Sequence, residues 1–493
     1  MKSWLSWFLS GLVILGLAIL IGRIVELQII KGNYYRNLAE GNRIKRVPIV
    51  APRGRILARG GEVLVGSREV EGIWVRDYPL NSKFAHVGGY LGMVNENEAG
   101  KINPKCPEKG PYKAGSLIGR SGLEQEYECV LSGTDGEKLV EVDITGKEIR
   151  VLGTKPAVVG QDLKTSIDYN LQTFVPDLMQ NQKGAIIITD TKGQVLSLYS
   201  SPSFDPQKVG DYLNDANYPL FNRAIGGLFH PGSVFKPVVA IAGLMEGKID
   251  KSYLYNDTGF ITVGVYKYSN WFYSQYGRVE GELNVVRALA RSTDTFFYNL
   301  GGLLGAEKIT SWADRFGLDK ITNIDLPGEV AGLIPTPAWK LKTTGEPWFL
   351  GNTYHISIGQ GDLAVTPISL NAMIASIASG GYLCKPQINF TDKPDCHKLD
   401  IKKEYLDIVK EGMTGVCQTG GTGYTFFDFT IPIACKTGTA ETSQDGKTHA
   451  WFTAFAPVES PQIVVTVLFE QGGEGSKVAG PVARKIFDYV FHE

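Results

Sequence analysis

The stretch FHPGSVFKP, Phe229–Pro237, combines a turn, the start of a helix and two reactive side chains. It has the form S-x-x-K, with an apolar run after Lys236. If Ser233 begins a helix, Lys236 lies about one turn further along the same face. The hydroxyl and the amine are then within reach of each other, which is the minimum for a nucleophile with its own base. By itself the pattern also fits an exposed first helical turn, so its meaning depends on the rest of the chain.

Length, composition and charge set the broad class. The chain has 493 residues, of which 43% are hydrophobic and 20% charged, so two or three globular domains are expected. The net charge of −1 gives no general attraction to nucleic acid, and no nucleic-acid partner is predicted. The chain has 6 His and no C-x-x-C pair, which argues against a structural zinc site, and no metal or cofactor is predicted.

The cysteines leave two interpretations open. An even number in an exported protein permits disulfides, and the simplest pairs join sequence neighbours. Six unpaired buried thiols are the alternative, because a free cysteine packs like a small hydrophobic residue. The neighbouring pairs are Cys106 with Cys129, Cys384 with Cys396, and Cys417 with Cys435.

The N-terminal segment predicts a membrane anchor. Trp4–Ile21 is almost entirely apolar and, as a helix of ~27 Å, is long enough to span a hydrocarbon core. Trp4 and Trp7 lie near one end, where interfacial aromatic residues belong. A cleaved signal peptide is the rival interpretation, but the long apolar run and the lack of an A-x-A site favour the anchor. Basic residues flank both ends, so charge does not set the orientation, and only the body's capacity for disulfides favours an extracytoplasmic location.

We expect three regions along the chain. They are an anchor with the start of a stalk at residues 4–30, a turn-rich, mostly β module at residues 31–160, and an α/β domain at residues 161–493. An amphipathic helical pattern covers residues 22–43, and short β-type runs alternate with Gly and Pro turns from residue 47 onward. The middle module contains no catalytic cluster, so binding or spacing is its predicted use.

The C-terminal region predicts an α/β fold with antiparallel hairpins. Two strands come first, then several helices, then three strands and a final helix, and this order is typical of a sheet flanked by helices. The predicted strands are residues 184–190, 194–199, 433–440, 448–455 and 463–469, and the main predicted helices are residues 233–245, 283–316, 367–379 and 482–491.

Two further motifs follow the S-x-x-K stretch. The first is Ser292-Thr293-Asp294 and the second is Lys436-Thr437-Gly438. S-x-x-K and K-T-G each occur once in the chain, in that order, with S-x-D between them. Motifs of these three kinds together are marks of class A β-lactamases and penicillin-binding proteins. Each signal is weak alone, and their common order makes a strong one.

Acyl transfer gives each motif residue a specific task. Ser233 needs a base, and Lys236 can be that base if its pKa is depressed by burial and by a second cation, for which Lys436 is the candidate. Ser292 can relay a proton between Lys236 and a leaving amine. Asp294 can hold a lysine in place by a charge-assisted hydrogen bond. These five residues are the predicted catalytic set.

The K-T-G strand fits a peptide substrate. Gly438 leaves space for a substrate backbone to add as a β-strand, and the hydroxyls of Thr437 and Thr439 suit a terminal carboxylate. The backbone N–H groups of Ser233 and Thr439 are predicted oxyanion-hole donors, and the helix N-terminus adds favourable potential. Alone, the motif also fits an ordinary strand end with a turn glycine.

With these residues in order, the chain resembles the class B penicillin-binding proteins, and most closely the elongation-type penicillin-binding protein 2 group. The resemblance covers nearly the whole chain. Asp294 stands where many relatives carry Asn, and an Asp at this position is typical of the elongation group. The pedestal region of residues 77–115 is short for this family. The segments that carry the resemblance are Asn42–Ile44, Ala51–Ile56, Gly119–Glu124, Pro231–Pro237, Gly359–Gly361, Val365–Pro367, Gly420–Gly423 and Lys436–Ala440.

The resemblance implies a fold, a reaction and partners. The implied fold is an antiparallel sheet flanked by helices (residues 161–493) on a dimerisation-type pedestal (residues 31–160), with one helix in the cytoplasmic membrane and the catalytic domain outside. The implied reaction is D,D-transpeptidation of peptidoglycan stem peptides ending in D-Ala-D-Ala, through a serine acyl-enzyme that β-lactams also form, in cell elongation and shape maintenance. A membrane glycosyltransferase of the shape, elongation, division and sporulation type is the implied partner.

Other functions remain open at this stage. They are a septal-type transpeptidase, a D,D-carboxypeptidase in which water replaces the acceptor amine, and a β-lactam-sensing or scaffold protein without turnover. Glu280–Asn284 is similar to the deacylating loop of class A β-lactamases, but it precedes Ser292 instead of following the middle motif. We therefore expect a turn and a helix cap there, and His449 is expected to be a packed side chain.

Replacing the predicted nucleophile gives the first test. Ser233→Ala removes the only hydroxyl of the S-x-x-K motif, so labelling by a fluorescent penicillin is expected to be lost. In-gel fluorescence and the intact mass of the protein after β-lactam treatment measure this loss. Persistent labelling at an unchanged site would assign the nucleophile to another residue.

Overall fold

The chain folds into two units whose segments alternate along the sequence. The computed structural model describes residues 2–143, 145–442 and 446–492. The smaller unit contains the chain up to Gly54 together with Ser67–Val75 and Ser132–Gln161. The larger unit contains Arg55–Gly66, Arg76–Leu131 and the chain from Asp162 onward. The predicted domain boundaries after residues 30 and 160 remain predictions.

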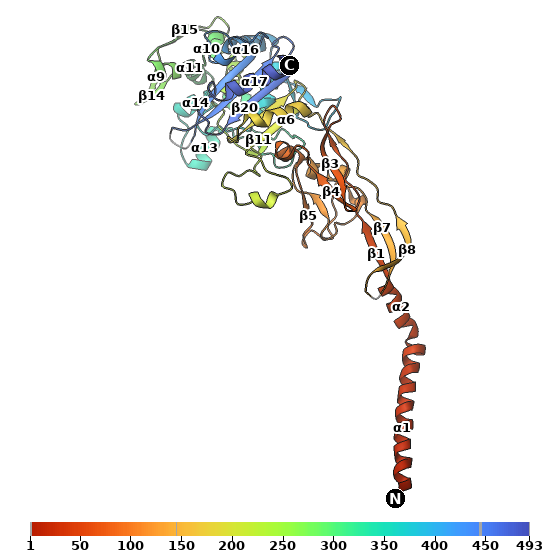
Figure 1. Ribbon diagram of the computed structural model, residues 1–493. Coiled ribbons are helices and arrows are strands. Elements are labelled where there is room, and N and C mark those ends of the chain that lie inside the picture. The colour runs from red at the N-terminus through yellow and green to blue at the C-terminus, as the bar shows by residue number, and fades with distance from the viewer. Residues whose placement is uncertain (1, 144, 443–445, 493) are drawn as a thin grey trace. The chain divides into compact units, whose positions relative to one another are not determined.

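The smaller unit begins with a long apolar helix. Helix α1 (Lys2–Val25) continues through one π-helical turn (Glu26–Ile30), and helix α2 (Gly32–Arg43) follows (Figure 1). Ser3–Ile30 has a mean hydropathy of 2.4 in its most apolar window, and none of that window is buried, so it is long and apolar enough to cross a membrane. A signal sequence near an N-terminus has the same features.

The smaller unit also contains a three-stranded antiparallel sheet, whose first strand follows helix α2 directly in the sequence. Its order is β1 (Ile44–Ile49), β7 (Gly136–Val142) and β8 (Glu148–Lys155). The buried carboxylate of Glu141 accepts hydrogen bonds from Arg43 and Arg150, one residue from each side of the middle strand. The ion pairs therefore tie the end of α2 and strand β8 to β7. Residues 137–144 alternate between polar and apolar side chains, which predicts a strand there. The structure confirms this strand up to Val142, and residue 144 lies outside the described residues.

A five-stranded antiparallel sheet forms the centre of the larger unit. Its order is β11 (Val195–Ser201), β10 (Gly184–Thr189), β20 (Ile463–Phe469), β19 (Thr448–Ala456) and β18 (Ala434–Glu441). The K-T-G strand β18 is thus an edge strand, paired only with β19 among the strands of this sheet. The predicted hairpin and the three predicted C-terminal strands are confirmed.

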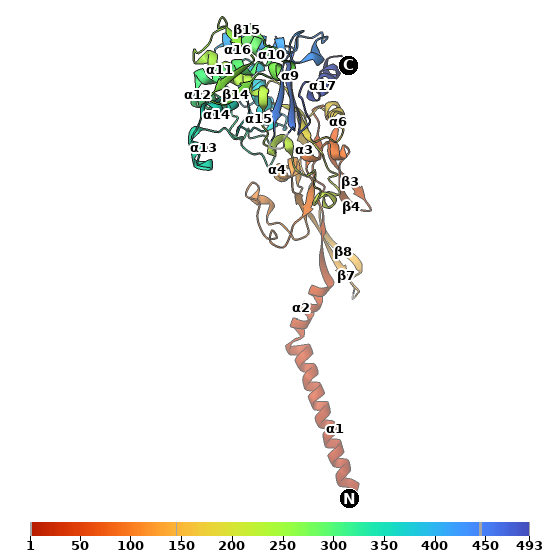
Figure 2. The same ribbon diagram turned by 90° about the vertical axis from the view of Figure 1, so that its left-hand side faces the viewer.

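Helices cover both faces of this sheet because its strands are apolar on both sides. On β20, Val465 and Val467 face helices α6 (Tyr169–Leu178) and α17 (Ala479–His492) in one core cluster. Val464 and Leu468 belong to the opposite face and pack in a second, larger core. Figure 2 shows the two sets of helices on either side of the strands. The helices that contribute most to the larger core are α8 (Lys236–Met245), α10 (Val285–Arg291), α11 (Asp294–Leu304), α12 (Ala306–Arg315), α15 (Pro367–Ala378) and α16 (Lys403–Val416).

Polar side chains in the sheet position helix α15. Thr189 donates to the Asn371 side-chain oxygen at 2.8 Å, and the Asn371 amide donates to the Thr466 hydroxyl at 3.1 Å. All three are fully or almost fully buried, so each polar group needs a partner inside the protein. These directional bonds set the position of α15 over strands β10 and β20, which apolar contacts alone would leave free to slide.

The remaining elements of the chain are short. The helices are α3 (Ala85–Gly88), α4 (Gly122–Glu126), α5 (Glu128–Leu131), α7 (Arg223–Gly226), α9 (Trp271–Tyr276), α13 (Pro337–Thr344) and α14 (Leu350–Ser357). The strands are β2 (Ile56–Leu57), β3 (Val63–Val70), β4 (Ile73–Asp77), β5 (Leu91–Met93), β6 (Leu117–Gly119), β9 (Leu163–Lys164), β12 (Tyr255–Asp257), β13 (Phe260–Val263), β14 (Tyr266–Ser269), β15 (Gly281–Leu283), β16 (Tyr382–Cys384) and β17 (Cys396–Lys398).

The structure resolves the open question of the cysteines. All three sequence-neighbour pairs form disulfides: Cys106 with Cys129, Cys384 with Cys396, and Cys417 with Cys435. The last of these joins the residue after helix α16 to strand β18, one position before Lys436. It therefore anchors both the K-T-G strand and the loop that begins at Gly420.

Two smaller expectations are also settled. Within Glu280–Asn284 the expected helix cap is confirmed, because the Asn284 side chain accepts a hydrogen bond from the Arg287 N–H at 3.0 Å. The expected turn is wrong, because Gly281–Leu283 forms strand β15 and pairs with β12. His449 is buried and packs against Phe229, and its Nδ1 accepts from the Gln471 N–H, so it is a packed side chain. The predicted helix of residues 233–245 differs in its first turn, since Gly232–Phe235 is a 3-10 turn and α8 begins at Lys236.

Candidate active site

Ser233 lies in the 3-10 turn before helix α8. The N–H of Gly232 donates to the Gly359 carbonyl at 2.9 Å, and both glycines have positive φ angles, +56° and +75°. A Cβ on Gly359 would lie 2.2 Å from the Gly232 carbonyl oxygen, so a larger residue cannot fit there without moving the turn. The half-buried Ser233 side chain lines a cavity of about 460 Å³. Its hydroxyl forms no hydrogen bond with another described residue.

Lys236 is completely buried one turn further on, and its ammonium group is fully hydrogen bonded. It donates to Asp294 Oδ1 at 2.6 Å, to the Ser292 carbonyl at 2.7 Å and to Ser292 Oγ at 3.2 Å. An ammonium has three N–H donors, and these three acceptors use all of them. This explains why the described contacts contain no hydrogen bond between Lys236 and Ser233, although their spacing places them on adjacent turns.

The electrostatics of the two buried lysines differ from the sequence expectation. Burial lowers the pKa of Lys236, while the charge of Asp294 and its hydrogen bond raise it. From the sequence, the charge of Lys436 is expected to lower the pKa of Lys236, but in the structure the charge of Lys236, after burial, lowers the pKa of Lys436. The pKa of Lys436 is lowered well below its usual value by burial first and then by the positive charge of Lys236. The asymmetry has a simple cause: Asp294 is hydrogen bonded to Lys236 and not to Lys436.

Ser292 connects the two lysines. It follows helix α10 in a left-handed conformation, with φ +54°, which turns the chain sharply before helix α11. Its hydroxyl oxygen accepts hydrogen bonds from Lys236 at 3.2 Å and from Lys436 at 2.8 Å. A serine that accepts from two ammonium groups still has its own proton to donate. The Ser292 side chain, which also lines the cavity, can therefore pass a proton between the lysines and a bound molecule.

Asp294 is held by residues that sequence reasoning missed. Its Oδ2 accepts from the Trp271 N–H at 3.0 Å, and its own N–H donates to the Asn270 side-chain oxygen at 3.2 Å. Asn270 in turn donates to Asp257, which also accepts from the Thr295 hydroxyl at 2.6 Å. Asn270 precedes helix α9, and a capping-type residue in front of an aromatic helix was the only signal of it in the sequence.

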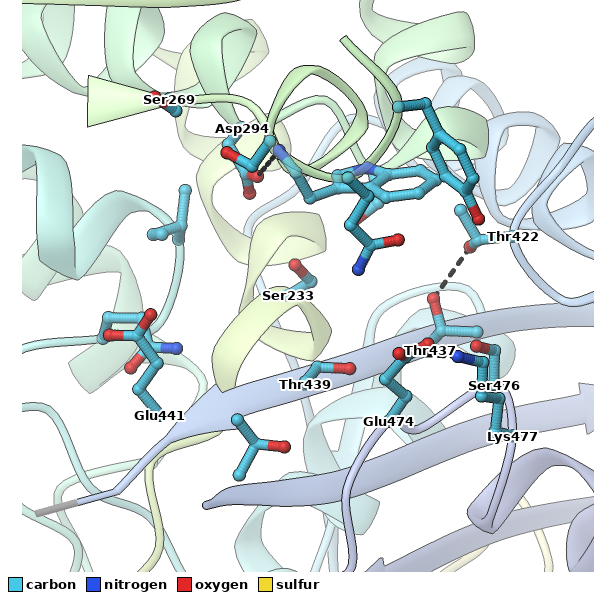
Figure 3. Close-up of a pocket in the computed structure, with 18 of the residues that line it drawn as sticks. Ser233, Ser269, Asp294, Thr422, Thr437, Thr439, Glu441, Glu474, Ser476 and Lys477 are labelled. Carbon is cyan, nitrogen blue, oxygen red and sulfur yellow. Dashed lines mark hydrogen bonds and ion pairs between the residues drawn. The ribbon is translucent and has the colours of Figure 1, made fainter. Parts of the chain in front are cut away.

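The edge strand β18 forms one wall of the cavity (Figure 3). Thr437 and Thr439 line the cavity, two positions apart as on one face of a strand. The Thr437 hydroxyl is 2.8 Å from the Thr422 hydroxyl of the loop after α16. Packing gives a reason for Gly438, because a Cβ there would lie 3.0 Å from the Val234 side chain and 3.1 Å from the Pro231 carbonyl. The glycine lets the strand pack against the turn that carries Ser233.

All eight predicted site residues are therefore in or directly behind one cavity. Ser233, Ser292, Asp294, Thr437 and Thr439 line it, and Gly438, Lys236 and Lys436 are buried behind the lining. Across residues 2–143, 145–442 and 446–492, no group of three or more His, Cys, Asp or Glu side chains could hold a metal ion. A serine next to two buried amines, a bridging hydroxyl and an edge strand are the parts of a serine acyltransferase that works on a peptide.

Comparison with known proteins agrees with this class. The family described as "Penicillin binding protein transpeptidase domain" matches residues 184–488, and the family described as "Penicillin-binding Protein dimerisation domain" matches residues 69–165. Peptidoglycan D,D-transpeptidase MrdA of Escherichia coli K12 is 33% identical over 461 residues, which cover 86% of this chain and 72% of the relative.

Two solved structures are similar in fold. One is penicillin-binding protein 2 (PBP2) of Pseudomonas aeruginosa in complex with WCK 5153, with a TM-score of 0.78, 32% identity, and coverage of 91% of this chain and 97% of that one. The other is PBP2 of Helicobacter pylori in complex with MreC, with a TM-score of 0.79, 26% identity, and coverage of 91% and 99%. This chain belongs to the penicillin-binding protein family, in its class B, and is most similar to the PBP2 group.

The contact between Gly359 and Gly232 gives a test of how the serine is positioned. Gly359→Ala places a Cβ against the Gly232 backbone at an unfavourable φ, so the Ser233 turn must move. We expect acylation by a fluorescent penicillin to slow about tenfold or more. Gly345→Ala is the matched control, since Gly345 also has a positive φ, +74°, but open space around it. Equal acylation rates in both variants would contradict the positioning of Ser233 by Gly359.

Proposed function

We propose that this protein is the D,D-transpeptidase that cross-links peptidoglycan stem peptides during cell elongation, with Ser233 as the residue that carries the acyl group. Family membership and the similarity to MrdA support the reaction. The observation that carries the assignment of residues is the Ser292 hydroxyl, which bridges both buried lysines at 3.2 Å and 2.8 Å and also lines the cavity with Ser233.

In the proposed acylation step, Ser233 Oγ attacks the carbonyl of the penultimate D-Ala. The Ser233 proton passes to Lys236 in its neutral form, which burial favours by lowering the pKa of that lysine. Lys236 and Ser292 then deliver a proton to the nitrogen of the departing D-Ala. The N–H groups of Ser233 and Thr439 are the proposed donors to the oxyanion.

In the second step, an amine of a neighbouring stem peptide attacks the acyl-enzyme. The amine loses a proton to the same relay, the bond to Ser233 Oγ breaks, and the serine recovers its proton. Thr437 and Thr439, with Thr422 hydrogen bonded to Thr437, are the proposed contacts of the terminal carboxylate of the donor. A β-lactam follows the first step only, because its leaving nitrogen stays attached to the acyl group.

The domain assignment belongs to this proposal. Residues 4–30 are the proposed anchor and stalk start, residues 31–160 the pedestal, and residues 161–493 the transpeptidase domain in an extracytoplasmic location. The apolar helix of Ser3–Ile30 and the family matches at residues 69–165 and 184–488 support this arrangement. A membrane glycosyltransferase is the proposed partner enzyme. The complex of H. pylori PBP2 with MreC supports a further partner from the cell-shape machinery.

The products formed from a complete substrate test the proposal. The full-length protein, supplied with lipid II and a membrane glycosyltransferase, is expected to form cross-linked stem-peptide dimers that mass spectrometry of digested strands detects. The Ser233→Ala variant is the control and should form none. Trimmed tetrapeptides without dimers would identify a carboxypeptidase, and acylation by penicillin without either product would identify a non-turnover protein.

The pH dependence of acylation tests the pair of Lys236 and Asp294. The negative charge of Asp294 raises the pKa of Lys236, so Asp294→Asn lowers that pKa further. Since neutral Lys236 is the proposed base, the acylation rate rises with pH through this pKa, and the rising limb is expected to move to lower pH in the variant. The maximal rate should also fall, because the neutral amide oxygen of Asn is a weaker acceptor for the Lys236 ammonium group than the Asp294 carboxylate.

Measurements of the second-order rate with a fluorescent penicillin across pH give both quantities. Asp362→Asn, at an exposed carboxylate outside the lysine network, is the matched control. A rising limb that stays in place or moves to higher pH in Asp294→Asn would contradict the proposed base.

A further inference from the structure

One carboxylate of the cavity has no task in the reaction described above. Glu441 is the last residue of strand β18 and lies two positions after Thr439, so it belongs to the same face of the strand and lines the same cavity. It is exposed, and none of the described residues forms a hydrogen bond or an ion pair with its side chain. The other two carboxylates that line the cavity are both paired, Asp294 with Lys236 at 2.6 Å and Glu474 with Lys477 at 2.7 Å.

The two ends of the cavity differ in charge. Thr422, Thr437 and Lys477 lie at one end, and Glu441 lies at the opposite end, with Ser233 between them (Figure 3). Lys477 is the only Lys or Arg among the described residues that line the cavity. The Glu441 end therefore has a negative charge that no described side chain neutralises.

Two neighbouring side chains, the buried Tyr298 and the exposed His355, are close enough to feel this charge. The charge of Glu441 contributes, after burial and Asp294, to the raised pKa of Tyr298, and it opposes the lowering of the His355 pKa by burial. The charge of Glu441 thus acts on Tyr298, which lines the cavity, and the same unpaired charge attracts a cation that enters this end.

The geometry of an added strand sets which part of the substrate reaches Glu441. A donor whose carboxylate lies at the hydroxyl-rich end, near Thr437, must extend along β18 past Ser233 towards Glu441. Residues in a strand advance about 3.3 Å each, so Glu441 is about 7 Å beyond Thr439. The side chain of the residue that precedes the two D-Ala residues therefore reaches this end, and an acceptor peptide that approaches Ser233 from this side meets the same carboxylate.

We propose that Glu441 binds a protonated amine of the stem peptide. This inference rests on the proposed transpeptidase function and adds a specificity residue to it. Cross-linking uses a side-chain amine of the stem peptide, and both the donor and the acceptor peptide contain the residue that carries it. The amine that Glu441 binds can therefore belong to either peptide. The carboxylate selects a stem peptide with a free amine, while penicillin, which carries none in the corresponding position, does not depend on it.

The test compares Glu441→Gln with Glu474→Gln in the full-length protein. Both substitutions remove one carboxylate of the cavity wall at nearly constant size, and only the first removes the proposed amine contact. Acylation by benzylpenicillin is expected to stay within about twofold of the wild-type rate in both. Two measurements then distinguish the sources of the amine.

For a donor contact, release of D-Ala from a pentapeptide with a free side-chain amine falls about tenfold in Glu441→Gln, and acetylation of that amine causes the same loss in the wild type. For an acceptor contact, D-Ala release is unchanged, but cross-linked dimers fall about tenfold in favour of hydrolysed tetrapeptide. Glu474→Gln should show neither effect. Either result supports the amine site.

The inference is overturned if Glu441→Gln forms as many cross-links as the wild type and prefers the free amine over the acetylated amine as strongly as the wild type does. It is also overturned if benzylpenicillin acylation falls as much as cross-linking, because Glu441 would then support the site's structure only. If the wild type forms no cross-links at all, the proposed function fails instead, so the two failures are distinct. Glu441→Asp, which keeps the charge, should retain more cross-linking than Glu441→Gln.

Discussion

The burial of the Lys236 ammonium group is the interaction on which the rest of the active site depends. A charge without access to water is tolerated only when it is paired and fully hydrogen bonded, and Asp294 together with two atoms of Ser292 meets that requirement. Removing one partner from such a pair typically costs about 3–5 kcal/mol. The fold must therefore place helix α8, the turn between α10 and α11, and helix α9 within hydrogen-bond distance of one another, and the reactive geometry follows from this.

The second lysine makes the arrangement chemically useful. Lys436 is also completely buried, and in the described contacts it has the Ser292 hydroxyl and the Thr437 carbonyl as acceptors but no carboxylate. Two cations that share one hydroxyl repel each other, so one of them is readily deprotonated. One of the two lysines is therefore available as a neutral amine that can take up the proton that Ser233 loses in the proposed reaction. Because Asp294 is paired with Lys236, Lys436 loses its proton more easily than Lys236 does. The Ser292 hydroxyl, which is hydrogen bonded to both lysines, can then pass a proton from Lys236 to Lys436 and so leave Lys236 neutral.

Close backbone packing positions Ser233, the proposed nucleophile, against strand β18. Gly232, Gly359 and Gly438 bring the Ser233 turn, the segment after α14 and strand β18 to distances at which a Cβ would clash. The disulfide of Cys417 and Cys435 holds the same strand from its other end. A rigid strand with a free edge suits a reaction in which the substrate backbone supplies the next strand, and the Glu441 carboxylate at the end of that edge adds a chemical preference.

Much of the chemistry was determined by the sequence alone. The order of S-x-x-K, S-x-D and K-T-G predicted Ser233, Lys236, Ser292 and Lys436 as site residues, and short apolar runs between turns located all five strands of the central sheet. These features are local, since they depend on spacing within one turn or one strand, so pattern reasoning reaches them.

Only the tertiary structure decided how these parts meet. Asn270 and Asp257 support Asp294 although they precede it in the sequence by 24 residues or more, and neither belongs to a recognised motif. Distances between remote segments also decide that all three N–H donors of Lys236 are used and that the pKa of Lys436 is lowered by burial and by the charge of Lys236. They decide as well that the cysteines form disulfides instead of remaining free thiols. The difference in charge between the Lys477 end and the Glu441 end of the cavity is likewise decided by the tertiary structure. Hydrogen bonding and charge interactions act over a few ångströms in space, and residues far apart in the chain reach that range only after the core has packed.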